Sequence, residues 1–296
     1  MLDTDIGTDV DDAVALALAL ASPEVELTAV TTVSGDTRRR ASIVARIFEL
    51  SGRPLPVLAA GAVDPLGPDR GFLWLGHEGR GFLADDQRGD WREDAADAFA
   101  DAVLERQAQP IAIGPLTNVA RALARRPALA GSSLTLMGGV IGLNPELPPF
   151  EYNLGSDAEA SLAVFDSALD LTLVPLDVTL QTFLTADHLK RLRRSATPLR
   201  QALCEAMEIW WPLHQQLFAG RRRYGADVVC FLHDPLTLAI LLDRSFVTIE
   251  PMRLRAELAD GLFRLIPVDD GRSCSVVTAV DAATFVEFLM ERLLRL

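Results

Sequence analysis

Up to about Leu242, short runs rich in β-branched and apolar residues alternate with segments of helical periodicity. This alternation is typical of a mostly parallel sheet with helices on both faces. The pattern predicts strands over Val25–Val33, Leu55–Ala59, Pro110–Gly114, Ser133–Met137 and Leu171–Leu176. It predicts helices over Asp11–Ala21, Arg38–Leu50, Asp94–Gln107, Asn118–Arg125 and Asp157–Phe165, and a helical region Leu184–Ala219 interrupted near Ala196–Pro198.

The pattern changes after Asp243 to short alternating runs, at Val247–Ile249, Met252–Leu258, Leu262–Pro267 and Ser275–Val280. Such runs predict antiparallel strands that extend the sheet or form a flap. A final helix over Ala282–Leu294 has Asp281 placed to cap it. We therefore expect one α/β domain over residues 1–296, with an open, mostly parallel Rossmann-like sheet, helices on both faces and a short antiparallel C-terminal addition.

The charge balance and apolar content limit the classes of ligand. The chain has 296 residues, 49% of them apolar, and carries 41 acidic against 28 basic side chains, a net charge of −13. This balance argues against a general grip on nucleic-acid phosphates, so we expect a neutral, cationic or metal-bridged ligand. Lys190 is the only lysine, which excludes a Gly-Lys-Ser/Thr phosphate loop. The longest apolar run, Ala13–Ala21, is far shorter than the roughly 20 residues of a membrane-spanning helix.

The cysteines favour a reducing compartment. Cys204, Cys230 and Cys274 are too few and too far apart for a disulfide framework or a zinc ribbon, and their odd number leaves at least one thiol unpaired. No basic region followed by an apolar segment precedes the first helix, so there is no sign of a secretory signal. We expect a cytoplasmic protein.

Five carboxylates, Asp3, Asp5, Asp9, Asp11 and Asp12, fall within ten residues between a strand stub and the apolar helix. Caps on a solvated turn would explain one or two of them, but not five. Convergent like charges repel, and a hard divalent cation with oxygen ligands is the simplest compensation. The end of a first strand is also where open α/β sheets bind ligands. The cluster therefore predicts a metal site.

Two classes of metal-dependent enzyme carry such a cluster. The run Asp3-Thr4-Asp5-Ile6-Gly7-Thr8 resembles the first motif of haloacid-dehalogenase-type phosphatases, which use magnesium and attack phosphorus with the first aspartate. Those enzymes also need a basic residue, usually lysine, to hold the phosphate. Lys190 lies in the charged helical stretch His188-Leu189-Lys190-Arg191, which indicates a solvated face, although an arginine could substitute.

The second class matches more of the chain. The stretch Leu2-Asp3-Thr4-Asp5-Ile6-Gly7-Thr8-Asp9-Val10-Asp11-Asp12-Ala13 resembles the signature of the inosine–uridine-type nucleoside hydrolases. Later segments agree with that family in order: Thr31-Thr32-Val33-Ser34-Gly35-Asp36, Gly114-Pro115-Leu116-Thr117-Asn118, Met137-Gly138-Gly139 followed by Glu151-Tyr152-Asn153, and His233-Asp234-Pro235. The ordered set is far more specific than any single segment.

The resemblance implies a calcium ion held by Asp5, Asp12 and Asp234 together with the backbone carbonyl of Ile113. Calcium accepts such a mixture of carboxylate, carbonyl, water and sugar oxygens. The resemblance also implies that Asp5 is the general base, taking a proton from calcium-bound water. The implied reaction is hydrolysis of the N-glycosidic bond of ribonucleosides to ribose and free nucleobase, in which nearby carboxylates stabilise the positive charge on the ribose ring.

The remaining site residues follow from the same resemblance. Asp11 and Asn153 are implied to hold ribose hydroxyls, and Glu151 and Asn144 to reach the 5′-hydroxyl. Asp36 stands where the family commonly has asparagine, so it can accept hydrogen bonds from ribose hydroxyls but lacks the amide donor. Asp3 is expected to orient its neighbours.

Two histidines have a functional and a structural interpretation. His233 is implied to help the leaving base depart, but it could also be a histidine hydrogen-bonded beside a metal ligand. His77 is implied to lie near the base, and a surface-loop histidine is an equal alternative. Trp74, Trp210, Trp211 and Tyr224 could stack on a nucleobase or belong to the core, and none is assigned individually.

The leading hypothesis is thus a calcium-dependent ribonucleoside hydrolase, acting on a small nucleoside as a homodimer or homotetramer. The enzyme alternative is the magnesium-dependent phosphatase. A third, non-catalytic alternative is a metal-stabilised binding protein for nucleosides or ribose, which would return the nucleoside intact.

Overall fold

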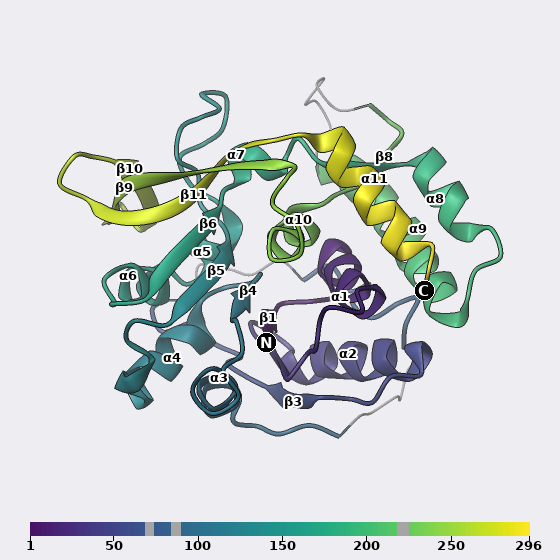
Figure 1. Ribbon diagram of the computed structural model, residues 1–296, viewed down its shortest axis with the longest axis horizontal. Coiled ribbons are helices and arrows are strands. Elements are labelled where there is room, and N and C mark those ends of the chain that lie inside the picture. The colour runs from purple at the N-terminus through teal and green to yellow at the C-terminus, as the bar shows by residue number, and fades with distance from the viewer. Residues whose placement is uncertain (69–73, 84–89, 218–224) are drawn as a thin grey trace.

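The computed structural model describes residues 1–68, 74–83, 90–217 and 225–296, and its centre is a nine-stranded sheet (Figure 1). The strand order is β10-β9-β11-β6-β5-β4-β1-β2-β3. The parallel part consists of β1 (Leu2–Thr4), β2 (Ala29–Thr32), β3 (Val57–Ala60), β4 (Ile111–Ala112), β5 (Ser133–Met137) and β6 (Asp170–Val174). Asp3 in β1 lies opposite Thr31 on one side and Ala112 on the other. The first strand of the chain is therefore a central strand of the sheet.

The predicted antiparallel addition is confirmed, and it extends this sheet. β11 (Arg272–Val280) runs parallel beside β6, β9 (Val247–Ala259) pairs antiparallel with β11, and β10 (Leu262–Pro267) pairs antiparallel with β9. The two runs predicted on either side of Pro251 form one continuous strand. Proline is tolerated there because β10 pairs with β9 only from Leu254 onward, so Pro251 faces a strand on one side only.

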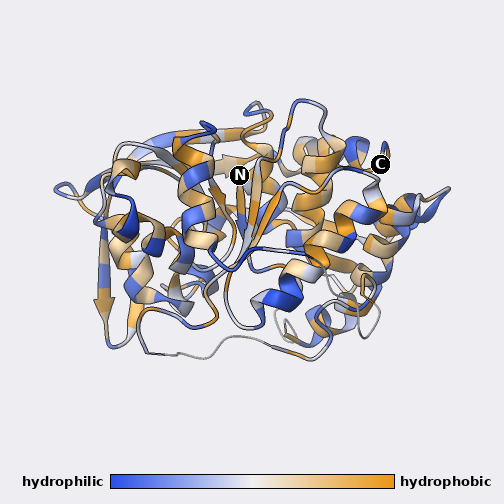
Figure 2. Cartoon of the chain, turned by 90° about the horizontal axis from the view of Figure 1, so that it is seen from below, coloured by the Kyte–Doolittle hydropathy of each residue, from blue (hydrophilic) through white to orange (hydrophobic). Residues whose placement is uncertain are grey.

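Helices cover both faces of the sheet, as predicted. On one face, α3 (Ala95–Leu104), α4 (Thr117–Arg125) and α6 (Ala158–Phe165) share one apolar core. A second core on the other face is formed with α1 (Asp11–Ala21), α2 (Thr37–Ser51), α9 (Pro198–Leu217), α10 (His233–Ala239) and α11 (Ala282–Leu293). Figure 1 shows the two groups on opposite sides of the strands, and Figure 2 shows hydrophobic strands between them. The helix α1 is apolar all round because it is buried on almost every side.

Several boundaries differ from the prediction. The strand predicted over Val25–Val33 is limited to β2, because the Val25 N–H bonds to the Ser22 carbonyl in a turn after α1. The region Leu184–Ala219 contains the end of β7 (Phe183–Thr185), then α8 (Ala186–Arg193) and α9, with the predicted interruption between the helices; positions 218–219 lie outside the described residues. The short elements α5 (Tyr152–Ser156), α7 (Leu176–Thr179), β8 (Val228–Phe231) and α10 were not predicted. Asp281 caps α11 as predicted, accepting from the Thr284 N–H at 3.1 Å.

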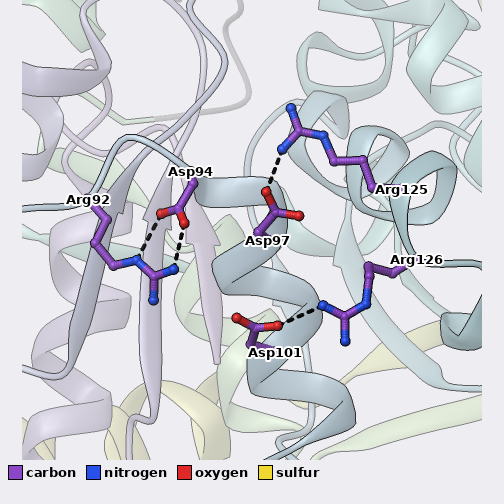
Figure 3. Close-up of polar contacts among 6 residues, drawn as sticks. All are labelled: Arg92, Asp94, Asp97, Asp101, Arg125 and Arg126. Atoms are coloured by element: carbon purple, nitrogen blue, oxygen red, sulfur yellow. Dashed lines mark hydrogen bonds and ion pairs between the residues drawn. The ribbon is translucent and has the colours of Figure 1, made fainter.

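Surface ion pairs connect α3 with α4 on the side away from β1. Asp97 and Asp101 of α3 pair with Arg125 and Arg126 at 2.7 and 2.9 Å, while Arg92 pairs with Asp94 (Figure 3). These side chains are partly exposed at the surface, so each pair contributes little stability. Within the four described stretches of chain, no helix has the length and apolar character needed to cross a membrane.

Candidate active site

Two helix N-termini meet at the carboxyl end of β1. Asp5 follows that strand, Asp11 and Asp12 lie in the first turn of α1, and Asp234 lies in the first turn of α10. The two helices pack against each other (Figure 1), and the Asp234 N–H donates to Asp11 Oδ2 at 3.2 Å. One carboxylate oxygen from each of Asp11, Asp12 and Asp234 lies within 4.8 Å of the other two. The fold thus brings residues near the N-terminus together with Asp234, 223 positions after Asp11, in one acidic centre.

Burial makes this acidic centre unfavourable without a compensating charge. Burial raises the pKa of Asp12 and Asp234 well above the usual range, and repulsion by neighbouring carboxylates raises it further. The same causes raise the pKa of Asp11. A proton or a bound cation relieves such repulsion, and buried, convergent carboxylate oxygens are the donors that hard divalent cations prefer. The donor set therefore fits a divalent cation.

Asp5 borders the same cavity but lies outside the group of three. Its backbone is held by the fully buried Arg40 of α2, whose guanidinium donates to the carbonyl oxygens of Asp5 and, at 2.9 Å, Ile6. Burial raises the pKa of Asp5, and the charge of Arg40 opposes part of this rise. A Cβ on Gly114 would lie 2.7 Å from Asp5 Oδ1, so the close packing here requires glycine.

Asp3 is fully buried beneath these residues. Its Oδ1 accepts hydrogen bonds from Thr31 Oγ1 at 2.5 Å and Asn118 Nδ2 at 2.8 Å, and burial raises its pKa to about 7. The neighbouring Thr4 hydroxyl donates to Asp12 Oδ1. The side chains of β1 therefore connect the acidic centre to the adjacent strand and to α4.

A cavity of about 520 Å³ opens over the acidic centre. Its acidic lining residues are Asp5, Asp9, Asp11, Asp12, Glu151 and Asp234. Its apolar and aromatic lining residues are Ile113, Met137, Phe150, Tyr152, Leu176, Leu180, Trp210, Leu217, Leu262 and Phe263. A cavity of this size and mixed lining suits a small molecule that has both a polyhydroxylated part and a flat apolar part.

Ile113, Glu151 and Asn153 line the same cavity. Asn153 Nδ2 donates to the Ile113 carbonyl at 3.2 Å and to the Met137 carbonyl at 3.3 Å. Glu151 caps α5, because its oxygens accept the N–H groups of Asn153 at 2.6 Å and Leu154 at 3.2 Å, and Glu151 also accepts the Gly139 N–H at 2.9 Å. Burial raises the pKa of Glu151. The side chain thus fixes the loop that carries it.

His233 also lines the cavity, at the start of α10. Its Nδ1 is 2.7 Å from the hydroxyl of Thr179 on α7, and its ring lies 5.4 Å from that of Phe231. Burial lowers the pKa of His233 to about 3, and the nearby His214 contributes in the same direction. The imidazole is therefore neutral near pH 7.

Three predicted substrate contacts are not among the cavity-lining residues. Asp36 is exposed and caps α2 by accepting the Arg39 N–H at 2.9 Å. Asn144 bonds within its own loop, where its Oδ1 accepts the Glu146 N–H at 3.1 Å. His77 is buried, its Nε2 is 2.8 Å from the Thr8 carbonyl, and its ring stacks at 5.7 Å on Trp210, which does line the cavity.

Other lining residues carried no clear sequence signal. Trp210 was one of several candidate aromatics and is the one that borders the cavity, whereas Trp211 donates from Nε1 to the Ala226 carbonyl at 3.3 Å and Trp74 lies over Arg40. Tyr224 lies outside the described residues.

Arg40 sits in a run of arginines that is typical of a solvated helix face. Arg40 lies one helical turn after the capping residue Asp36, and only this spacing could have indicated that the Arg40 side chain points inward.

Comparisons with known proteins agree with this geometry. The family model described as inosine-uridine preferring nucleoside hydrolase matches residues 1–287. A pyrimidine-specific ribonucleoside hydrolase RihA of Salmonella paratyphi C is 31% identical, over 99% of this chain and 97% of that protein. The solved structure of a purine-preferring ribonucleoside hydrolase from Gardnerella vaginalis has a TM-score of 0.84 at 28% identity, covering 99% of this chain and 97% of the other. A plant nucleoside hydrolase structure gives 0.83 at 26%, with the same coverage. The chain therefore belongs to the inosine-uridine preferring nucleoside hydrolase family, metal-dependent enzymes that hydrolyse ribonucleosides.

Proposed function

We propose that this chain is a calcium-dependent ribonucleoside hydrolase in which Asp5 is the general base. The observation that supports this proposal best is the convergence of Asp5, Asp11, Asp12 and Asp234 on one cavity, with carboxylates of the last three within 4.8 Å of one another. A cation can lie among the three grouped carboxylates with Asp5 on the same cavity, and that cavity has room for a nucleoside.

The metal ligands in this proposal are Asp5, Asp12, Asp234 and the carbonyl of Ile113, which all border the cavity. When bound, a calcium ion would supply positive charge that lowers the pKa of water and attracts neighbouring sugar hydroxyls. Asp11 and Asn153, which lie beside these ligands, would each hold a ribose hydroxyl. Glu151 would reach the 5′-hydroxyl with the acceptor capacity that the backbone leaves free.

In the reaction, Asp5 would take a proton from the water that attacks C1′ of the ribose. The bond between C1′ and the base nitrogen breaks, and its electron pair leaves with the base. Positive charge that develops on the ribose ring is stabilised by the surrounding carboxylates. His233, which lines the same cavity, would assist the departing base. Asp36, Asn144 and His77 stay in the proposal as contacts that would need their loops to approach the ligand.

A panel of purine and pyrimidine nucleosides, assayed for free base with calcium and with a chelator, tests the proposal. Base release that requires calcium supports it. Intact nucleosides together with phosphate release from a model ester would overturn it in favour of a phosphatase. The panel also decides base preference, because similar proteins are named pyrimidine-specific in one case and purine-preferring in the other.

We further propose that residues 1–296 form one domain that works in the cytoplasm as a homodimer or homotetramer. The buried, free thiols of Cys204, Cys230 and Cys274 agree with a reducing compartment. Light scattering on the purified chain gives the subunit number, and limited proteolysis tests the single domain.

A further inference from the structure

Among the described residues, the Thr179 hydroxyl is the one hydrogen-bond partner of a ring nitrogen of His233. The hydroxyl oxygen is 2.7 Å from Nδ1, and Thr179 itself is fully buried at the end of α7 and is not among the residues that line the cavity. The opposite edge of the ring carries Nε2, on a residue that lines the cavity. Thr179 therefore holds the ring from behind.

The direction of this hydrogen bond follows from counting donors and acceptors. A neutral imidazole has one N–H and one acceptor nitrogen, and a threonine hydroxyl has a single hydrogen. If Nδ1 donated to Thr179, the hydroxyl hydrogen would need another acceptor, and among the residues that the structure describes the hydroxyl has no hydrogen-bond partner except His233. A buried O–H without an acceptor is unfavourable, so the hydroxyl donates and Nδ1 accepts.

We infer that Thr179 is a positioning residue that keeps His233 in the tautomer with hydrogen on Nε2. This inference rests on the proposed function, in which His233 assists the departing base. With hydrogen on Nε2, the imidazole offers a hydrogen bond to the ring nitrogen or carbonyl of the base that gathers negative charge as the glycosidic bond breaks. The other tautomer would present the lone pair of Nε2 to the negatively charged base and oppose the departure of that base.

The experiment compares substrates that differ in their need for this hydrogen bond. Thr179→Val removes the hydroxyl and keeps the shape, whereas Thr179→Ser keeps the hydroxyl. We expect the valine variant to lose roughly ten- to hundredfold in kcat on the best natural nucleoside. We expect less than about threefold loss on 4-nitrophenyl riboside, because nitrophenolate stabilises its own charge. The serine variant should restore nucleoside turnover, and KM should change little throughout.

Thr182→Val is the matched control. Thr182 is equally buried, and its hydroxyl donates to the Thr179 carbonyl at 2.8 Å without touching His233. We expect this variant to keep the wild-type ratio of kcat on the nucleoside to kcat on 4-nitrophenyl riboside. Equal losses on both substrates in Thr179→Val, or a ratio shifted as much in Thr182→Val, would overturn the inference.

A readout independent of turnover separates this inference from the proposed function. Nitrogen NMR of labelled protein reports the tautomer of His233, assigned by comparison with His233→Gln. We expect hydrogen on Nε2 in the wild type and a mixture of tautomers in Thr179→Val. Hydrogen on Nδ1 in the wild type overturns the role of Thr179. Release of no base from any nucleoside, with the Nε2 tautomer present, overturns the proposed function instead.

Discussion

The backbone N–H of Asp234 donates a hydrogen bond to the carboxylate of Asp11, 223 positions earlier in the chain. This contact connects the first turns of α1 and α10, so the acidic centre depends on the relative position of two helices. A shift of the N-terminus of either helix would change the distances between the carboxylates of α1 and the carboxylate of Asp234.

Replacement of Asp5 by asparagine should remove the general base and one negative charge. We expect kcat to fall by about 10²- to 10⁴-fold while the fold persists, because asparagine has nearly the same shape. Steady-state kinetics and circular dichroism measure the two quantities. Asp97→Asn, which changes an exposed residue paired with Arg125, is the control and should keep wild-type turnover. Near-normal turnover in Asp5→Asn would refute the role given to Asp5.

Removal of divalent cations should abolish base release, and added calcium should restore it. Calcium should also raise the melting temperature by several degrees, since a ligand that binds only the folded state stabilises it. Asp234→Asn should raise the calcium concentration needed for both effects, whereas Glu93→Gln, a surface change, should not. An identical calcium response in Asp234→Asn would show that the ion binds elsewhere.

The metal-free protein should become less stable relative to Asp3→Asn as the pH rises. Burial raises the pKa of Asp3 to about 7, while an aspartate in an unfolded chain titrates near 4. Between these values the folded state binds more protons than the unfolded state, so this group lowers the free energy of unfolding as pH increases. Asparagine can still accept from Thr31 and Asn118 but does not titrate. Urea unfolding of both proteins at pH 5 and pH 7, with chelator present, measures the difference. A difference that does not change with pH would contradict the buried state of the Asp3 carboxylate.

Loss of Arg40 should be strongly destabilising. Arg40→Met leaves the carbonyl oxygens of Asp5, Ile6 and Ser34 without their buried donor. We expect the free energy of unfolding to fall by about 3–5 kcal/mol, because three carbonyl oxygens lose their buried hydrogen-bond donor. Arg38→Ala, two positions earlier and paired with the exposed Glu93, should leave the free energy of unfolding almost unchanged. Similar unfolding midpoints for the two variants would show that the Arg40 contacts do not hold the acidic loop.

The sequence predicted the parallel sheet, its antiparallel addition and the acidic cluster because these features repeat or concentrate within a short stretch. It did not predict α7 and α10, since elements of one or two turns are too short to show a period. It also could not indicate side-chain direction in loops. Asp36 stands in a matching segment and Asn144 in the loop between two of them, yet the Asp36 side chain caps a helix and the Asn144 side chain accepts from the Glu146 N–H in its own loop.

The apolar residues that line the cavity could not be predicted from the sequence for a different reason. Leu180, Trp210 and Phe263 come from three distant segments, and each looks like an ordinary core residue in the sequence. Only the tertiary fold places them beside the carboxylates. Thr179 is missed for the same reason, because its hydroxyl matters only through a contact with His233 that spans 54 positions.

The hairpin of β9 and β10 places Leu262 and Phe263 at the cavity, while β10 pairs along one edge only. Leu262 is exposed, so its side chain can be exchanged with little disturbance to the interior, whereas Phe263 is buried and packs on Phe165. Evolution can therefore vary the outer part of this cavity, and with it the range of accepted molecules, while the aspartates beneath stay constant. Libraries randomised at Leu262 are a direct route to altered selectivity.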